Sequence, residues 1–329
     1  MHHAQVVADA IDKVDFGRYS EAVELFNRFL SEHPEFIDDE FKTDILAVNK
    51  LIKYRKDLEE WDYFRSLKLV YSYFEKTYGS EELDVPKEAQ AVPDMPDVIW
   101  WCWLQGYDEA PNIVKACFRS LKKLNRPIIV LTEDNYSDYA SLPEHIIRKW
   151  KDGIISNAHF ADALRLELLT IHGGTWIDST VLLTDASAYR LMTEGTELFA
   201  YAYIMHDATR DYILYGNWLI HSSAYSKILW ETKLMLYKYW ERENSLMNYF
   251  IFHLFFTISC RRNRDEMAKI PTYSDAPCHI MQIELLGAYS PERFRQLLSM
   301  SGIHKLTYRY DSSADTRGTI LEHIINLNE

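Results

Sequence analysis

The sequence predicts an α/β fold that follows a smaller all-helical region, and two observations support this. After residue 96, short apolar runs alternate with amphipathic helical segments, a pattern that is typical of an α/β sheet. Before residue 84, apolar residues recur at helical spacing, and the prolines within 84–96 interrupt any regular element between the two patterns. The expected organisation is therefore a helical region over residues 1–90 and an α/β domain over residues 91–329.

The helical region contains a phrase, from Gly17 to Pro34, that resembles the second half of a tetratricopeptide repeat. A small residue, Ala22, would let two helices approach, and Phe26 would fill the groove between them. Solenoid repeats need neighbours to bury their faces, and we find a single such unit. We therefore expect a helical hairpin that packs on the main domain, with a peptide-binding array as the alternative.

The elements of the α/β region follow from its apolar pattern. Each expected strand is a short apolar run, and each expected helix has apolar residues at the spacing of one helical face. The expected strands are Asp97–Leu104, Pro127–Thr132, Trp176–Leu183 and Leu198–Ala202, and the expected helices are Ile113–Leu124, Asn157–His172, Tyr225–Arg242 and Asn248–Ser259. Ligands of open α/β sheets bind beyond the carboxyl ends of the strands, so the residues there are the candidates for a site.

Composition and charge exclude several classes of protein. The chain has 329 residues with 36 basic and 49 acidic side chains, and its formal charge of −13 opposes binding to nucleic acid. Four cysteines without C-x-x-C spacing argue against a zinc ribbon and for a reducing compartment. The most apolar segment, 249–260, is too short to cross a bilayer, and no signal peptide is recognised. A cytoplasmic protein is expected.

The passage from Asn157 to Leu183 carries the strongest functional signal. Asp162 and Arg165 share one face of the expected helix, Gly173-Gly174 stops that helix, and the following strand delivers Asp178 to its end. Each feature by itself has a structural explanation, because the Asp/Arg pair could be a surface ion pair and the glycines a helix cap. Their combination favours a site in which the Asp178 carboxylate binds a divalent cation or a sugar hydroxyl.

With these pieces in order, the chain resembles the bacterial capsular polysaccharide synthesis proteins, which are related to the family-32 sugar transferases and have a GT-A fold. The resemblance covers roughly residues 93–310. It is carried by MPDVI at 95–99, WLQG at 103–106, Pro111, DALR at 162–165, GGTWID at 173–178 and HKLTY at 304–308. It implies a GT-A-like α/β/α sandwich that moves a sugar from a nucleotide-diphosphate donor, a UDP-sugar, onto a glycan.

The resemblance also implies roles for individual residues. Asp178 corresponds to the first acid of the family's Asp-x-Asp element and would bind Mn²⁺ or Mg²⁺ together with His304. The second acid is replaced by Thr180, whose hydroxyl is a weak ligand for such a cation. Lys305 lies in the net-positive stretch 260–310 and would neutralise the charge that builds on the departing diphosphate during catalysis.

Five further residues are assigned to the donor site on the same grounds. Trp103, at the end of the first expected strand, would stack on the nucleobase, or else belong to the core. Asp162 and Arg165 would contact the ribose and the sugar hydroxyls. Asn217 would line the sugar pocket, and Gly174 would let the backbone approach the donor closely.

The expected function is a retaining hexosyltransferase of capsule or exopolysaccharide synthesis. Asn248 stands where the family usually has Asp and cannot act as a base, which suits retention. The expected acceptor is a lipid-linked or growing oligosaccharide, reached by a peripheral protein at the inner face of the plasma membrane, with contacts to the membrane or to capsule enzymes. Two alternatives stay open. One is a non-catalytic sugar-binding or scaffolding module, and the other is a metal-independent transferase in which Lys305 and arginines replace the cation.

Overall fold

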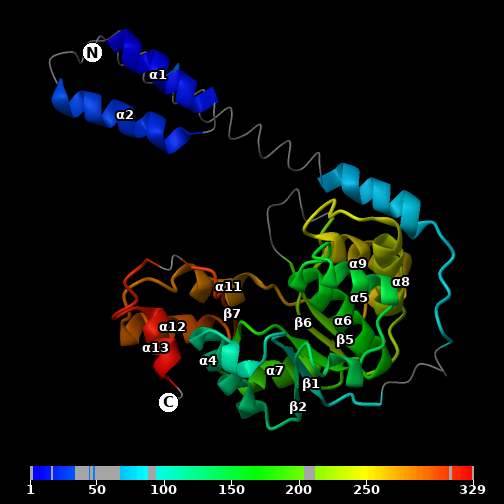
Figure 1. The fold of residues 1–329 in the computed structure, drawn as a ribbon. Coiled ribbons are helices and arrows are strands. Elements are labelled where there is room, and N and C mark those ends of the chain that lie inside the picture. Colours follow the sequence, from blue (N-terminus) through cyan, green and yellow to red (C-terminus); the bar gives the residue numbers. More distant parts are fainter. Residues whose placement is uncertain are drawn as a thin grey trace. The chain divides into compact units, whose positions relative to one another are not determined.

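The computed structural model describes residues 3–15, 18–33, 44, 47–48, 67–87, 94–203, 212–310 and 313–327. The chain forms two compact units, Met1–Leu69 and Val70–Glu329 (Figure 1). The boundary between the two units, after Leu69, lies about 20 residues before the boundary expected from the sequence at residue 90. Residues 70–87 belong to the larger unit. In this segment Phe74 stacks on Phe255 with ring centroids 4.7 Å apart, and Tyr78 is fully buried.

The smaller unit contains two packed helices, α1 (His3–Asp15) and α2 (Tyr19–Glu32). Val6 and Ala10 of α1 join one buried cluster with Ala22 and Phe26 of α2. The small side chain of Ala22 is fully buried, in agreement with the expected close approach of two helices. Pro34, which ends the phrase that resembles a tetratricopeptide repeat, lies outside the described residues.

The larger unit is built around a five-stranded sheet with the strand order β2-β1-β3-β6-β5. Strand β1 (Ile99–Cys102) pairs in parallel with β2 (Ile128–Leu131) and β3 (Gly174–Ile177). Strand β6 (Tyr215–Ser222) runs antiparallel to both β3 and β5 (Leu198–Ala202). The predicted α/β class is therefore confirmed. The sequence does not predict β6, because the small and polar residues Gly216, Asn217 and His221 interrupt its apolar run.

Helices cover both faces of this sheet, as the GT-A-like α/β/α class requires. Successive side chains of a strand point to opposite faces. Thr175 of β3 hydrogen-bonds the Tyr189 hydroxyl of α7 (Ala186–Thr193) at 2.7 Å, whereas Trp176 lies against Arg165 of α6 (Asn157–Ile171). Helix α8 (Lys227–Arg242) packs against α6, and α9 (Ile251–Arg262) packs against α8. On the Thr175 side of the sheet lies α4 (Asn112–Leu121).

A second, two-stranded sheet joins a late segment of the chain to the end of β3. The expected strand Trp176–Leu183 is interrupted, because residues 178–180 turn the chain between β3 and β4 (Val181–Leu183). Strand β4 pairs antiparallel with β7 (Ile303–Lys305), with Val181 opposite Lys305 and Leu182 opposite His304. The segment after residue 303 is thereby held beside the turn that carries Asp178.

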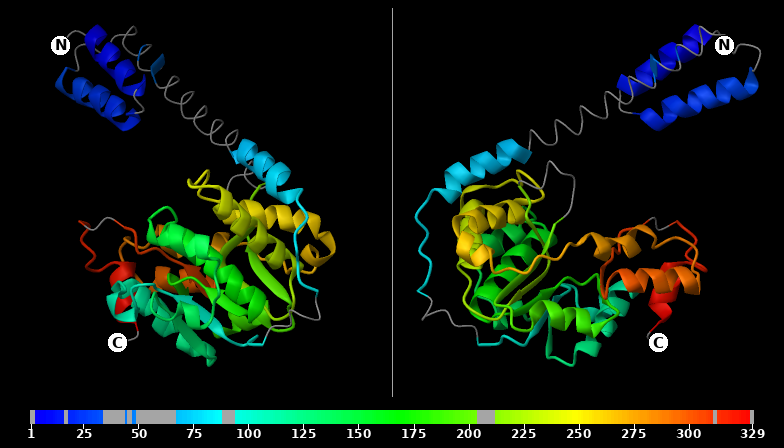
Figure 2. Two further views of the ribbon diagram at one scale, coloured as in Figure 1. Left: turned by 45° about the vertical axis from the view of Figure 1, so that its right-hand side comes forward. Right: turned by 180° about the vertical axis from the view of Figure 1, so that it is seen from behind.

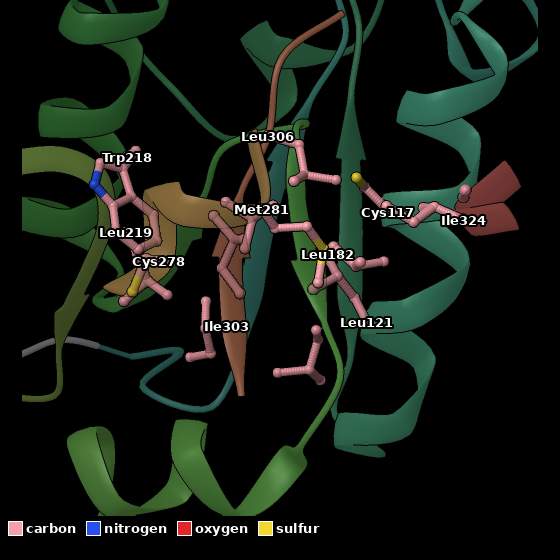
Figure 3. Packing of buried hydrophobic residues seen from close by; sticks show 14 of the residues in the cluster. Cys117, Leu121, Leu182, Trp218, Leu219, Cys278, Met281, Ile303, Leu306 and Ile324 are labelled. Carbon is pink, nitrogen blue, oxygen red and sulfur yellow. The ribbon is translucent and has the colours of Figure 1, made fainter. Parts of the chain in front are cut away.

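Buried apolar side chains hold this second sheet in place. Figure 3 shows Leu182 of β4 and Ile303 of β7 among side chains from several helices. These include Cys117 and Leu121 of α4, Met281 of α11 (Ala276–Ile283) and Ile324 of α13 (Ile320–Asn326). The orange and red C-terminal helices accordingly lie beside α4, away from the yellow α8 and α9 (Figure 2).

The remaining helices complete the larger unit. They are α5 (Glu144–Lys151), α10 (Arg264–Met267) and α12 (Pro291–Met300), with short helical turns at Glu75–Gly79, Tyr107–Glu109, Lys122–Leu124 and Tyr136–Asp138. In the part of the chain that the structure describes, none of the helices has both the length and the apolar character needed to span a bilayer.

Gly174 has a structural role at the start of β3. Its φ of 86° lies in the left-handed region, and a Cβ atom there would stand 2.5 Å from the Val98 carbonyl oxygen. The same Cβ would be 3.0 Å from the Trp100 ring nitrogen. The glycine thus allows β3 to approach the chain around β1. It does not line the cavity described below, so its assignment to donor binding is corrected.

We expect Gly174→Ala to lower the free energy of unfolding by about 3 kcal/mol or more, from the left-handed backbone and the steric overlap together. Gly195→Ala is the matched control, since Gly195 has a similar φ of 73° but open space around its Cβ position. It should cost only the backbone part, about 1–2 kcal/mol. Urea unfolding of both variants measures the difference, and equal losses would contradict the steric explanation.

Candidate functional site

A cavity of about 630 Å³ lies where β1, β3 and β6 meet the loops of the larger unit. The parallel strands β1 and β3 present their carboxyl ends to it through Cys102 and Asp178, and the antiparallel β6 presents its amino end through Asn217. This is the edge at which open α/β sheets bind ligands. The first turn of α6, the start of α9 and residues 305–309 form the remaining walls.

Asp178 stands at the end of β3 and is held by three donors. One carboxylate oxygen, Oδ1, accepts hydrogen bonds from Trp176 Nε1 at 2.9 Å and from Arg165 Nη2 at 3.1 Å. The other, Oδ2, lies 3.2 Å from Lys305 Nζ. The side chain of Asp178 keeps 26% of its surface exposed, so it remains reachable from the cavity.

Arg165 links the two carboxylates of the cavity. Its guanidinium donates from Nη1 to Asp162 Oδ1 at 2.5 Å and from Nη2 to Asp178. The rings of Trp176 and Phe252 lie 4.6 and 5.5 Å from the guanidinium carbon. Because Arg165 is only 3% and Asp162 only 6% exposed, this is a buried network and not a surface ion pair.

Asp162, like Asp178, is held by three neighbouring side chains. Besides Arg165 it accepts from Asn217 Nδ2 at 2.8 Å, and His159 Nδ1 lies 3.3 Å from its other oxygen. Burial opposes ionisation, but the Arg165 guanidinium and His159 hold the pKa of Asp162 below its ordinary value. The three expected donor-site residues Asp162, Arg165 and Asn217 are thus brought together with Asp178.

Lys305 reaches the cavity from β7. Its Nζ donates to the Thr180 hydroxyl at 2.6 Å and pairs with Asp178. The register of β4 and β7 explains this position, since Val181, the residue after Thr180, lies opposite Lys305. An ammonium group has three donors, and these two contacts leave one N–H for a ligand in the cavity.

His304 is not brought to Asp178, in contrast to its expected role as a metal ligand. Adjacent residues of a strand point to opposite sides, so Lys305 faces the cavity and His304 faces away from it. His304 is fully buried, and its Nε2 lies 3.1 Å from the Thr184 hydroxyl. Burial lowers the pKa of His304 to about 4. The residue belongs to the packing around β7.

The donor set of the cavity does not fit a divalent cation bound by Asp178 and His304. Both oxygens of Asp178 are engaged by cationic side chains, and the Thr180 hydroxyl is bound to Lys305. Within the described ranges, no group of three or more His, Cys, Asp or Glu side chains is arranged to hold a metal ion. We therefore derive no catalytic step through a metal.

Trp103 lines the mouth of the cavity together with Tyr308. The two rings meet edge to face, with centroids 5.2 Å apart. Trp100 and Trp101, by contrast, are fully buried in the core, as the sequence suggests. Trp103 and Tyr308 therefore form an aromatic corner in the wall of the cavity.

The sequence does not single out four other residues that line the cavity, namely His159, Tyr249, His253 and Arg309. His253 is 7% exposed, and burial lowers its pKa to about 4, so it is neutral near pH 7. Arg309 follows directly on the HKLTY phrase, which could have identified it. Nothing local marks the other three, because only the packing of α6 and α9 brings them to the cavity.

We expect the protein to lose stability in acid through its buried histidines. Burial lowers the pKa of His221, His253 and His304 to about 4 each, below the ordinary value of about 6.5. Between these values the unfolded chain binds more protons, so stability falls as the pH falls through this window, by up to about 1.4 kcal/mol per pH unit for each histidine. His304→Gln should flatten the dependence of the free energy of unfolding on pH. An unchanged slope between pH 6.5 and 4 would contradict the structural role of His304.

Comparison with known proteins agrees with the resemblance seen in the sequence. The model of a family described as capsular polysaccharide synthesis protein matches residues 50–324. No match is found among the curated proteins. Among solved structures, a chain titled PaToxG Glycosyltransferase is similar at 12% identity with a TM-score of 0.35, over 83% of this chain and 98% of that chain. The family match spans most of the sequence, and the chain therefore belongs to the capsular polysaccharide synthesis protein family.

Proposed function

We propose that the protein is a glycosyltransferase that moves a hexose from a nucleoside diphosphate sugar, a UDP-sugar, onto a growing glycan in capsular polysaccharide synthesis. The observation that carries this proposal is the cluster of Asp162, Arg165, Asp178 and Lys305 at the carboxyl edge of the sheet. It lies in a cavity of about 630 Å³, a size suited to a nucleotide sugar. Membership of the family supplies the biological context.

The chemistry requires the cavity to stabilise a departing diphosphate. The bond between the anomeric carbon and the β-phosphate oxygen breaks, and its electron pair stays on that oxygen. The acceptor hydroxyl oxygen bonds to the anomeric carbon, and its proton passes to the departing phosphate. Within the acid cluster, Lys305 has an N–H left to donate to this growing charge.

Retention of configuration is the proposed stereochemical course. Inversion needs a carboxylate that takes the proton of the acceptor hydroxyl. Asp162 and Asp178 are poorly suited to this role, because their carboxylate oxygens are already engaged by Arg165 and Lys305. Asn248, where the family usually has Asp, is uncharged and cannot act as a base. Its side-chain oxygen accepts a hydrogen bond from the Phe250 N–H at 2.8 Å, a local contact in the turn before α9.

The donor is proposed to lie along the cavity from the aromatic corner to the acid cluster. The nucleobase stacks at Trp103 and Tyr308, as planar rings do on exposed aromatic side chains. Asp162 and Asn217, held in one hydrogen-bonded group, face the ribose or sugar hydroxyls. Thr180 takes part through its bond to Lys305.

The acceptor is proposed to be a lipid-linked oligosaccharide at the inner face of the plasma membrane. Family membership supports a polymer acceptor. Tyr249 lines the cavity and is 61% exposed, and Leu246 and Met247 beside it are about 40% exposed. An aromatic ring of this kind offers a platform for an incoming sugar, and the apolar neighbours suit a peripheral contact with lipid.

A second candidate function is a sugar-binding or scaffolding module without catalysis. It is favoured by the Asp178 carboxylate, whose two oxygens are both engaged by the protein's own donors. The helices α1 and α2 would then recruit other capsule enzymes. Release of nucleotide from a panel of nucleotide sugars separates the two functions, because a module without catalysis releases none.

We expect Asp178→Asn to reduce nucleotide release by about 10² or more, since the change frees Lys305 and Arg165 from their anion and disorders the charge arrangement at the diphosphate. The free energy of unfolding should fall by about 1–2 kcal/mol, because Asn keeps one acceptor for the Trp176 N–H. Asp97→Asn is the matched control, as Asp97 is an exposed acid paired with Arg126 outside the cavity. Initial rates at saturating donor provide the measurement. A rate for Asp178→Asn within about twofold of wild type would favour the module without catalysis.

A further inference from the structure

We propose that the diphosphate of the donor is bound by Lys305 and Arg309 without a divalent cation, with the Lys305 ammonium between Asp178 and Thr180 in the place that a metal would take. The inference rests on the proposed function and deepens it. It departs from the metal site that an Asp-x-Asp element implies.

The position of the ammonium carries the proposal. In an Asp-x-Asp element, two side chains two residues apart share one cation. Here Lys305 Nζ stands between these two side chains, 3.2 Å from Asp178 Oδ2 and 2.6 Å from the Thr180 hydroxyl. The pairing of β4 with β7 fixes this geometry through the backbone, so the ammonium is built into the fold.

A divalent cation at the same place would meet strong repulsion. Arg165 already touches the other oxygen of Asp178 at 3.1 Å and is buried between two aromatic rings, so it cannot move aside. Like charges a few ångströms apart repel strongly at the effective dielectric of a partly buried site, and a divalent ion doubles this repulsion. The protein ligands offered in return are one carboxylate and one hydroxyl, and both are already bound to the Lys305 ammonium.

The charges of the cavity leave two cations for a ligand. The described side chains that line it include three cations, Arg165, Lys305 and Arg309, and three acids, Glu109, Asp162 and Asp178. Arg165 is bound to both Asp162 and Asp178 and is only 3% exposed. Lys305 keeps a free N–H and 19% of its side-chain surface, and Arg309 is exposed on the same wall of the cavity.

Two cations on one segment suit a diphosphate. Lys305 and Arg309 are four residues apart on the chain that leaves β7, and Tyr308 between them belongs to the aromatic corner. A nucleotide stacked at that corner would direct its phosphates along this segment toward Asp178. Lysine and arginine both bind phosphate oxygens through charge-assisted hydrogen bonds. Lys305 keeps its proton throughout and stabilises the charge left on the β-phosphate when the bond to the sugar breaks.

The test measures binding of UDP to the full-length protein by titration calorimetry, in EDTA and in Mn²⁺. We expect Kd values that agree within about twofold, because no metal takes part. If UDP binds only in the presence of Mn²⁺, the inference is overturned and the proposed function stands. If neither UDP nor GDP binds under either condition, the proposed function fails and this inference fails with it.

A pair of lysine variants makes the test specific. Lys305→Met should weaken UDP binding in EDTA about tenfold or more, the loss expected for a charge-assisted hydrogen bond. Lys305→Arg should restore part of the affinity, because it keeps the charge. Lys123→Met, at an exposed lysine outside the cavity, should bind like wild type. If Lys305→Met binds UDP in EDTA as tightly as the wild type, the inference is overturned. If that variant does not fold, the comparison of wild-type Kd values in EDTA and in Mn²⁺ tests the inference.

Discussion

The pairing of β4 with β7 is the interaction on which the candidate site depends. It connects the turn after β3 with a segment more than a hundred residues later in the chain, and buried side chains from α4, α11 and α13 hold the two strands together. Because a strand alternates its side chains, the register sends Lys305 into the cavity and His304 into the core. A shift of one residue would exchange the two and leave the cavity with an imidazole in place of an ammonium.

The second constraint is the balance of charge around Arg165. A guanidinium buried between Trp176 and Phe252 is tolerated because it donates to Asp162 and Asp178 together. This places two acids at the sheet edge and engages their oxygens within the protein. The result is a group of compensated charges, beside which Lys305 at the end of β7 and Arg309 four residues later line the same cavity.

Much of the fold follows from local patterns. The parallel strands β1 and β2, the helices α6, α8 and α9, and the hairpin around Ala22 appear close to where the apolar spacing puts them. The antiparallel β6 could not be predicted in this way, because the small and polar residues Gly216, Asn217 and His221 interrupt its apolar run. The break between β3 and β4 was also missed, since an apolar run does not reveal where its strand changes partner.

The sequence by itself determined the family and the α/β class, and it singled out Asp162, Arg165, Asp178 and Lys305 as candidates, because motif spacing and residue chemistry are local properties. Only the tertiary structure decided that Gly174 serves the approach of β3 to β1, that His304 is a core residue, and that His253 and Arg309 line the cavity. These outcomes depend on strand register and on which helix packs where. Both are set by contacts between residues far apart in the chain, which no local pattern encodes.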